Sequence, residues 1–260
     1  METDLRGRVV LVTGSTQGIG RAIALAAAAA KAEAIVVTGR DAKRGARVVA
    51  EIEAVGTAAA FVPADLGDPI SPDAIIDAAL RRFGAVDILV NAAALTDRGS
   101  VAESSLEFWE KLYAVNARAP FFLMQRVIQQ LRARGKPGSI VNILSINVHG
   151  GTPALAVYAS TKAALALLTK NAAHAHRFDR IRVNGINVGW ADTPAERQMQ
   201  AVTLGLGEEW LQKANAAQPF GRLLSPDDVA RLALFLMSDA SIPMTGALID
   251  QEQSVVGARD

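Results

Sequence analysis

Short apolar runs alternate along the chain with longer segments in which apolar residues recur at helical spacing. Residues 8–13 read RVVLVT, and the other short runs are also rich in valine, isoleucine and alanine. Runs that are apolar at successive positions are typical of strands covered on both faces. Strands are therefore predicted at residues 8–13, 34–38, 58–62, 86–90, 139–144, 181–188 and 246–250.

The segments between these strands have the periodicity of amphipathic helices. Helices are predicted at residues 21–30, 42–55, 72–83, 106–131, 156–176 and 227–237. The alternation predicts an α/β fold, a single-domain Rossmann-type doubly wound parallel sheet of about seven strands with helices on both faces. No Pro/Ser-rich linker, charge block or internal repeat divides residues 1–260, so one domain is expected.

Residues 190–219 form the least regular part of the sequence. They follow the sixth predicted strand, at the edge where open α/β sheets bind their ligands. We expect this segment to be a mobile substrate lid within the domain, with a plain surface excursion as the alternative.

Composition and charge narrow the possible partners. The formal net charge is +1, so no whole-chain field attracts nucleic acid or an anionic membrane. The chain has no cysteine, which excludes disulfides and thiol catalysis and fits a reducing compartment. Residues 1–4 do not resemble a secretory leader, and the longest apolar run, at residues 22–30, is too short to span a membrane. We therefore expect a soluble, cytoplasmic protein.

A glycine-rich segment, TGSTQGIG at residues 13–20, follows the first predicted strand and opens a helix. Such a turn places backbone N–H groups and a helix N-terminus against a pyrophosphate. The expected dinucleotide contacts are Gly14, Ser15, Gln17, Gly18, Ile19 and Gly20. The spacing differs from G-x-G-x-x-G and from the P-loop, and a glycine-rich turn without a ligand is the alternative.

Tyr158 and Lys162 stand four residues apart on a predicted helix, so their side chains share a face. An unperturbed tyrosine has a pKa of about 10, and a nearby ammonium group lowers that pKa by favouring the phenolate. A tyrosine tuned in this way can exchange a proton with an alcohol or carbonyl oxygen. For the pair alone, a surface tyrosine beside a solvated lysine is the alternative.

The glycine motif and the Tyr158–Lys162 pair, with Ser145, Asn116 and residues 189–193 (GWADT), resemble the motifs of the short-chain dehydrogenase/reductase family in order and spacing. The resemblance covers nearly the whole chain. It implies an oxidoreductase that transfers a hydride between a nicotinamide cofactor and an alcohol or carbonyl compound. It also implies a homotetramer.

The same resemblance implies catalytic roles for four residues. Tyr158 is expected to be the general acid/base, and Lys162 is expected to lower its pKa and to bind the nicotinamide ribose. Ser145 is expected to position and polarise the substrate oxygen. Asn116, on the long central helix, is expected to hold a water in the proton relay.

Further cofactor contacts come from two segments that depart from the usual family forms. Residues 91–94 read NAAA where NNAG is usual, and Val188 replaces the proline of the family's PGxxxT segment. A modest shift of the cofactor is expected, because residues 91–94 stay small. The contacts expected in these segments are Asn91, Ala92, Ala93, Gly189 and Thr193.

The residues after the second predicted strand favour NADP, with NAD possible. Gly39 stands where an acidic residue would bind the free ribose hydroxyls of NAD, and Arg40 can accommodate a 2′-phosphate. Gln17 argues against NADP, because many relatives that use NADP carry a basic residue at that position. The alternative to a cofactor role for Arg40 is that it is a solvated turn residue. Asp65 and Leu66 are expected at the adenine edge, unless Asp65 is only a turn residue.

Substrate contacts are expected from Ser145, Asn147, His149 and Trp190. This mixture of polar and apolar groups suits a sugar, a polyol or a keto compound, with a slight preference for a hydroxylated substrate. The chain has three histidines and no H-x-x-x-H pair, so no metal site is expected.

Two other classes of function are possible on this fold. A non-catalytic dinucleotide-binding regulator would be expected to lose Tyr158 or Lys162, and both are present. An epimerase or dehydratase usually has a longer C-terminal domain than the residues after the sixth strand provide.

Overall fold

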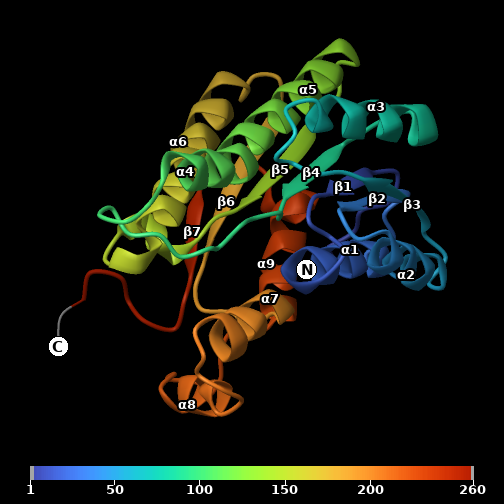
Figure 1. The fold of residues 1–260 in the computed structure, drawn as a ribbon. Helices are drawn as coiled ribbons and strands as arrows, with labels where there is room; N and C mark the ends of the chain where they lie inside the picture. Colours follow the sequence, from blue (N-terminus) through green and yellow to red (C-terminus); the bar gives the residue numbers. More distant parts are fainter. Residues whose placement is uncertain (1–2, 259–260) are drawn as a thin grey trace.

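A parallel sheet of seven strands crosses the molecule in the order β3-β2-β1-β4-β5-β6-β7 (Figure 1). The strands are β1 (Val9–Val12), β2 (Ala34–Gly39), β3 (Ala58–Pro63), β4 (Ile88–Asn91), β5 (Gly138–Ile143), β6 (Ile181–Val188) and β7 (Leu248–Gln251). The order reverses between β1 and β4, as in a doubly wound sheet, so the predicted fold class is confirmed. The computed structural model describes residues 3–258, and the first two and last two positions of the predicted domain 1–260 lie outside the described residues.

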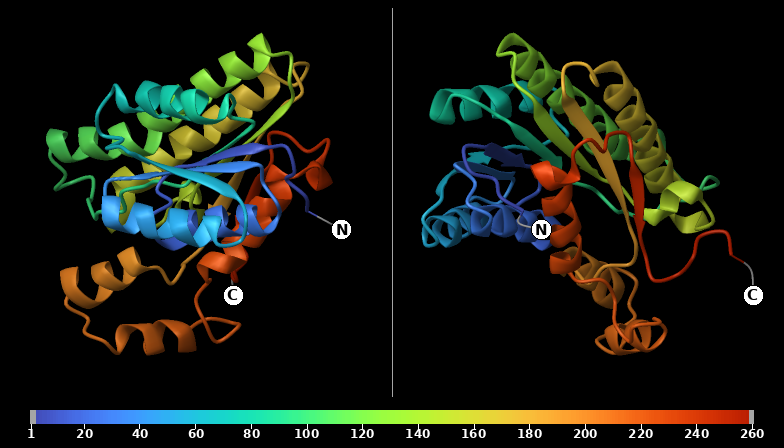
Figure 2. Two further views of the ribbon diagram at one scale, coloured as in Figure 1. Left: turned by 90° about the vertical axis from the view of Figure 1, so that its right-hand side faces the viewer. Right: turned by 180° about the vertical axis from the view of Figure 1, so that it is seen from behind.

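Helices cover both faces of the sheet (Figure 2). One face carries α1 (Gly18–Ala29), α2 (Ala42–Glu53) and α9 (Pro226–Met237), and the other carries α3 (Ser71–Phe83), α5 (Ala119–Ala133) and α6 (Ala156–Ala175). Along β1, Val10 and Val12 belong to the apolar core under the first layer and Leu11 to the core under the second. Both faces of the strand are buried, which is why its apolar run is continuous. Among residues 3–258, no helix is both long and apolar enough to cross a membrane.

The long helical region predicted at residues 106–131 is confirmed, but its middle is not a regular α-helix. Helix α4 (Leu106–Tyr113) joins α5 through a π-helical turn, η1 (Ala114–Arg118), which contains Asn116. Pro120, in the first turn of α5, has no backbone N–H and cannot donate to the Asn116 carbonyl at the i−4 position. The regular helical ladder is therefore broken at this point, and a π-turn takes up the extra residue.

Residues 190–219 stand apart from the sheet and its helices (Figure 1). They contain α7 (Pro194–Arg197), the π-helical η4 (Gln198–Thr203) and α8 (Trp210–Ala216). Trp210, Ala214 and Leu223 form a small buried cluster of their own. Backbone pairing between Ala191 and Leu224 joins the two ends of the segment. The segment is thus a helical body with its own core, anchored at both ends beside the sheet.

Reciprocal hydrogen bonds cap the N-terminus of α9. Ser225 Oγ accepts from the backbone N–H of Asp228 at 3.2 Å, and the Asp228 carboxylate accepts from the backbone N–H of Ser225 at 2.7 Å. Arg222 and Arg231 donate to the same carboxylate. The hydrogen bond from Arg222, followed by those from Ser225, holds the pKa of Asp228 well below its ordinary value.

Asp228→Asn is expected to lower the free energy of unfolding at neutral pH by about 1 kcal/mol, the usual effect of losing a helix cap. Because folding lowers the pKa of Asp228, its carboxylate stabilises the fold above the unfolded-state pKa of about 4, and this stabilisation is lost as the pH falls. Thermal unfolding of both proteins should therefore show a gap that narrows toward acid pH. Asp227→Asn, at the exposed neighbouring position, is the control, and an equal loss there would contradict the assignment.

Candidate active site

The turn between β1 and α1 packs directly against the chain that follows β4. Gly14 has φ +62°, and a Cβ atom on it would lie 2.7 Å from the Cα atom of Ala93. A Cβ atom on Gly20 would lie 2.5 Å from the carbonyl oxygen of Gly14. Thr13 Oγ1 accepts hydrogen bonds from the backbone N–H groups of Ala92 and Ala93, at 3.0 and 3.1 Å. The turn therefore requires glycine at positions 14 and 20. Thr13 binds the turn to the chain that follows β4, and it was not among the predicted site residues.

Helix α1 begins at Gly18, earlier than the predicted residue 21. Gly18, Ile19 and Gly20 form its first turn and line a cleft. The first N–H groups of a helix have no partner within the helix, and they carry a partial positive charge. The N-terminus of α1 is therefore available to bind an anion such as a pyrophosphate.

The cleft has a volume of about 740 Å³ and crosses the carboxyl ends of the strands where the strand order reverses. The predicted cofactor contacts in its wall are Gly14, Gln17, Gly18, Ile19, Gly20, Arg40, Asp65, Leu66, Ala92, Ala93, Gly189 and Thr193. The predicted catalytic and substrate residues in its wall are Ser145, Asn147, Tyr158, Lys162 and Trp190. A channel lined by glycine and alanine backbone, with a helix N-terminus in its wall, fits an extended dinucleotide.

Two predicted cofactor contacts, Ser15 and Asn91, lie behind the cleft wall and not in it. Ser15 Oγ donates to the Val12 carbonyl at 2.7 Å and accepts from the Thr38 backbone N–H at 3.1 Å. Asn91 Nδ2 donates to Asn142 Oδ1 at 2.8 Å. Ser15 thus joins β1 to β2 and Asn91 joins β4 to β5. Both residues hold the strands whose ends form the site.

Asn116 is fully buried and also lies outside the cleft wall. Its Oδ1 accepts from the Leu95 backbone N–H at 2.9 Å, and its Nδ2 donates to the Leu95 carbonyl at 2.9 Å and to Thr161 Oγ1 at 3.1 Å. Thr161 in turn donates to the carbonyl of Tyr158. The amide therefore ties the π-helical turn to the loop after β4 and to the turn of α6 that carries Tyr158.

Tyr158 and Lys162 are both buried on α6, with exposed fractions of 8% and 2%. The Tyr158 hydroxyl lies close enough to Ser145, which follows β5, for the Ser145 hydroxyl to lower its pKa. Lys162 Nζ donates to the carbonyl oxygen of Ile143 at 2.7 Å and lies 5.8 Å from the centroid of the Tyr158 ring. The end of β5 thus holds both side chains at one place in the cleft.

The expected lowering of the Tyr158 pKa by Lys162 was wrong for this arrangement. Burial raises the pKa of Tyr158 to about 12. Ser145 and the positive charge of Arg98 lower the same pKa, but their effect is smaller than that of burial. Burial lowers the pKa of Lys162 to about 8, so the amine is still mostly protonated at neutral pH and loses its charge only at higher pH. The ammonium group is also bonded to the Ile143 carbonyl. The charges that act on the Tyr158 pKa are those of Arg98, which lowers it, and Glu196, which raises it.

His149 does not line the cleft, although it was predicted to contact substrate. Its Nε2 lies 3.1 Å from Oδ1 of Asp250 on β7, and Asn187 Nδ2 donates to the same oxygen at 2.6 Å. The His149 ring is thus held against the end of β7, whereas Asn147 and Trp190 lie in the cleft wall as predicted.

Several polar residues in the cleft wall were not predicted. They are Arg98, Lys111, Thr152, Glu196, Gln200 and Glu252. None belongs to a local motif, and in the sequence these charged and neutral polar residues resemble ordinary surface residues. Only the packing of the loop after β4, of α7 and of the C-terminal segment beside α6 brings them together.

A family model for enoyl-(acyl carrier protein) reductases matches residues 14–251 of the chain. The 3beta-hydroxysteroid dehydrogenase 1 of Eggerthella lenta is 35% identical, over 96% of this chain and 94% of its own length. An NADP-dependent (R)-specific alcohol dehydrogenase of Lentilactobacillus kefiri is 32% identical, over 95% of this chain and 96% of its own. The chain belongs to the short-chain dehydrogenase/reductase family.

Solved structures place this short-chain dehydrogenase/reductase among enzymes that use nicotinamide cofactors. L-sorbose reductase from Gluconobacter frateurii, complexed with NADPH and L-sorbose, has a TM-score of 0.91 and 29% identity, and the match covers 100% of both chains. The protein is therefore an NAD(P)-dependent oxidoreductase. Within residues 3–258, no group of three or more His, Asp or Glu residues could hold a metal ion.

The adenosine end of the cleft of this dehydrogenase/reductase excludes a side chain at position 39. A Cβ atom on Gly39 would lie 2.8 Å from Cγ2 of Thr16. Arg40 lines the cleft beside it, and Arg44 donates to Oε1 of Gln17. Asp65 Oδ1 accepts from the backbone N–H of Gly67 at 2.9 Å, so Asp65 closes a turn as well as lining the cleft.

Lys162→Met is expected to raise the melting temperature at neutral pH, because it removes a buried ammonium group. The folded-state pKa of about 8 lies below the ordinary value of 10.5, so deprotonation makes the wild type more stable as the pH rises from about 8 to about 10.5. The advantage of the variant should shrink across that range in thermal unfolding curves. Lys170→Met, on the exposed face of α6, should show no such pH dependence. A variant that melts below wild type at pH 7 would mean that the bond to Ile143 outweighs the cost of burial.

Proposed function

We propose that this enzyme transfers a hydride between NADP(H) and the alcohol or carbonyl group of a sugar, polyol or keto compound, with Tyr158 as the general acid/base. The observation that supports this most directly is that Tyr158 and Ser145 are both buried and both line the wall of the cleft. A bound nicotinamide would supply or accept the hydride, and the protein would orient the substrate and move the proton.

In the reducing direction, Tyr158 donates a proton to the substrate carbonyl oxygen. The raised pKa of about 12 keeps the phenol protonated at neutral pH, so the proton is available. The Ser145 hydroxyl binds and polarises the same oxygen. Its neighbour Asn147 donates to Ser145 Oγ from the backbone N–H at 3.2 Å and from Nδ2 at 3.1 Å, which aims the remaining Ser145 O–H away from Asn147.

Lys162 and Asn116 support this chemistry from behind the tyrosine. An ammonium group has three N–H donors, and only one is used by the Ile143 carbonyl, so the others can bind the nicotinamide ribose. Asn116 supports the proton relay by fixing the loop after β4 and the Tyr158 turn of α6.

NADP is the favoured cofactor. An acidic side chain that would bind the ribose hydroxyls of NAD has no room at Gly39, because Thr16 occupies the space. Arg40 is exposed, lines the cleft and can pair with a 2′-phosphate. The Lentilactobacillus kefiri relative is NADP-dependent and the sorbose reductase is complexed with NADPH, which supports the same choice. NAD stays possible, because Gln17 supplies no second positive charge.

Residues 190–219 serve as the substrate lid in this proposal. Trp190, Thr193, Glu196 and Gln200 belong to the segment and line the cleft. The chain is also proposed to form a homotetramer, as the family resemblance implies. Exposed aromatic side chains on α4 and α5, among them Trp109, Phe121 and Phe122, would be covered by such association.

Tyr158→Phe is expected to lower kcat for ketone reduction about 10²- to 10⁴-fold, the usual contribution of a general acid. The dissociation constant for NADPH, measured by nucleotide fluorescence, should change less than about threefold, because the ring and its packing are kept. The chain has two tyrosines, which provides a matched control. Tyr113→Phe removes a hydroxyl that donates to Ser160 outside the cleft, and it should keep near-wild-type turnover. Retained turnover in Tyr158→Phe would refute the role given to Tyr158, whereas a wild type that binds NADPH and turns over no ketone would favour a non-catalytic dinucleotide-binding protein.

Arg40→Asp is expected to shift the ratio of kcat/KM for NADPH over NADH toward NADH by about tenfold or more, the effect of losing one charged hydrogen bond. Steady-state kinetics with both cofactors measures the ratio. Arg47→Asp makes the same charge change at an exposed position of α2 outside the cleft wall, and it should leave the ratio near the wild-type value. An unchanged ratio in Arg40→Asp would refute the role given to Arg40.

A further inference from the structure

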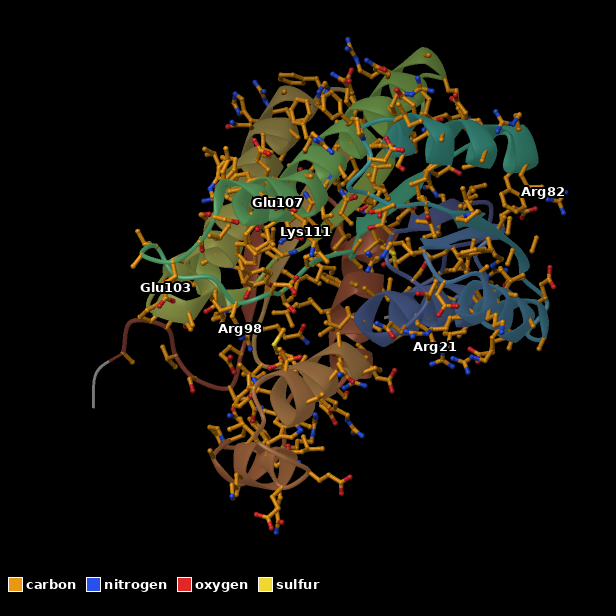
Figure 3. The ribbon with its side chains drawn as sticks, viewed as in Figure 1. Arg21, Arg82, Arg98, Glu103, Glu107 and Lys111 are labelled. Carbon is orange, nitrogen blue, oxygen red and sulfur yellow. The ribbon has the colours of Figure 1, made fainter. Side chains whose placement is uncertain are left out.

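A pair of opposite charges, Arg98 and Glu196, meets across the cleft close to Tyr158. Arg98 lies in the loop between β4 and α4 (Figure 3), and Glu196 lies in α7, which spans Pro194–Arg197. The Arg98 guanidinium is 3.5 Å from Oε1 of Glu196, and both side chains are largely buried. Both charges act on the Tyr158 pKa, Arg98 lowering it and Glu196 raising it. The pair and the Tyr158 side chain that is proposed to react line the same cleft.

Two hydrogen bonds and one ion pair hold Glu196, and all three are made with the same oxygen. Trp190 Nε1 donates to Oε1 at 2.9 Å, Gln200 Nε2 donates to Oε1 at 2.6 Å, and Arg98 is paired with Oε1 as well. Within the part of the chain that the structure describes, no donor reaches Oε2. A carboxylate has about four acceptor sites on its two oxygens, so Oε2 is an oriented acceptor with no protein partner.

The charges around Oε2 distinguish between possible substrates. A hydroxyl group can donate to Oε2 and accept from the neighbouring guanidinium, and this arrangement satisfies both charges. A substrate carboxylate at the same place would face the Glu196 carboxylate, and the Arg98 charge that could bind it is already paired. An apolar group would leave the partly buried carboxylate oxygen without any donor.

We propose that Glu196 determines the substrate class of this enzyme. Its Oε2 accepts a hydrogen bond from a second hydroxyl group of a neutral hydroxylated ketone or alcohol, and its charge excludes substrates with a carboxylate at that position. This inference rests on the proposed function, because it takes the end of the cleft beside Tyr158 as the place of reaction. It assigns a specificity role to a residue of α7 that no sequence motif singled out.

Three matched ketones test the inference in the reducing direction with NADPH. They are methyl propyl ketone, the same ketone with a terminal hydroxyl group, and levulinate, in which a carboxylate replaces the terminal methyl group. The wild type should show the highest kcat/KM for the hydroxylated ketone and the lowest for levulinate. The ratio of these two values should be about tenfold or more, as expected for one charged hydrogen bond.

Glu196→Gln should lower that ratio about tenfold or more. The three partners hold the amide oxygen in place of Oε1, so an N–H₂ group takes the position of Oε2, and the Arg98 charge becomes free to bind levulinate. Glu208→Gln makes the same charge change on an exposed residue of the lid segment and should leave the ratio unchanged. A ratio of two kcat/KM values does not depend on how much of the variant is folded, so partial misfolding cannot mimic the result.

Two outcomes would overturn the inference and leave the proposed function intact. One is an unchanged ratio in Glu196→Gln, which would make Glu196 only a structural clamp of α7. The other is a wild type that does not prefer the hydroxylated ketone. The proposed function fails separately, if reduction of the same ketones by Tyr158→Phe is as fast as by the wild type.

Discussion

The close approach of backbone to backbone at the carboxyl ends of β1 and β4 is the constraint on which the site depends. Gly14 and Ala93 are so near that no side chain fits between them, and Thr13 bonds the two segments through their N–H groups. The first turn of α1 and the loop after β4 are thereby held as two walls of one cleft. Because the strand order reverses at this point, no helix crosses above it, and the cleft stays open to a ligand.

At the end of the cleft that contains Tyr158 and Lys162, burial of a charged side chain lowers the stability of the fold. Lys162 is 2% exposed, yet its positive charge has no carboxylate partner among the described residues, only the carbonyl of Ile143. A buried ammonium group is destabilising, and its depressed pKa is the sign of that cost. The same burial keeps the Tyr158 phenol protonated. Such exchanges of stability for chemical competence are common at active sites.

The substrate end is assembled from segments that are far apart in the chain. Arg98 follows β4, Ser145 follows β5, and Glu196 follows β6, and the parallel sheet brings all three strand ends to one edge. Residues 190–219 can present Glu196 in a defined orientation because Trp210 and its neighbours give the segment a core of its own. An oriented carboxylate requires an ordered support, and a structureless loop would not supply one.

The sequence by itself determined the strands, their alternation with helices, the glycine turn and the spacing of Tyr158 and Lys162. These features leave local signatures, since burial on both faces makes a strand apolar at successive positions and a helix places residues four apart on one face. Other features were decided only by the tertiary structure. They are the π-helical turn at Asn116, the contact of His149 with Asp250, the supporting roles of Ser15 and Asn91, and the Arg98–Glu196 pair. Each depends on which distant residue lies opposite a side chain, and the raised pKa of Tyr158 likewise comes from burial by the whole fold. No local pattern in a chain encodes such neighbours, because the sheet and its covering helices bring them together only on folding.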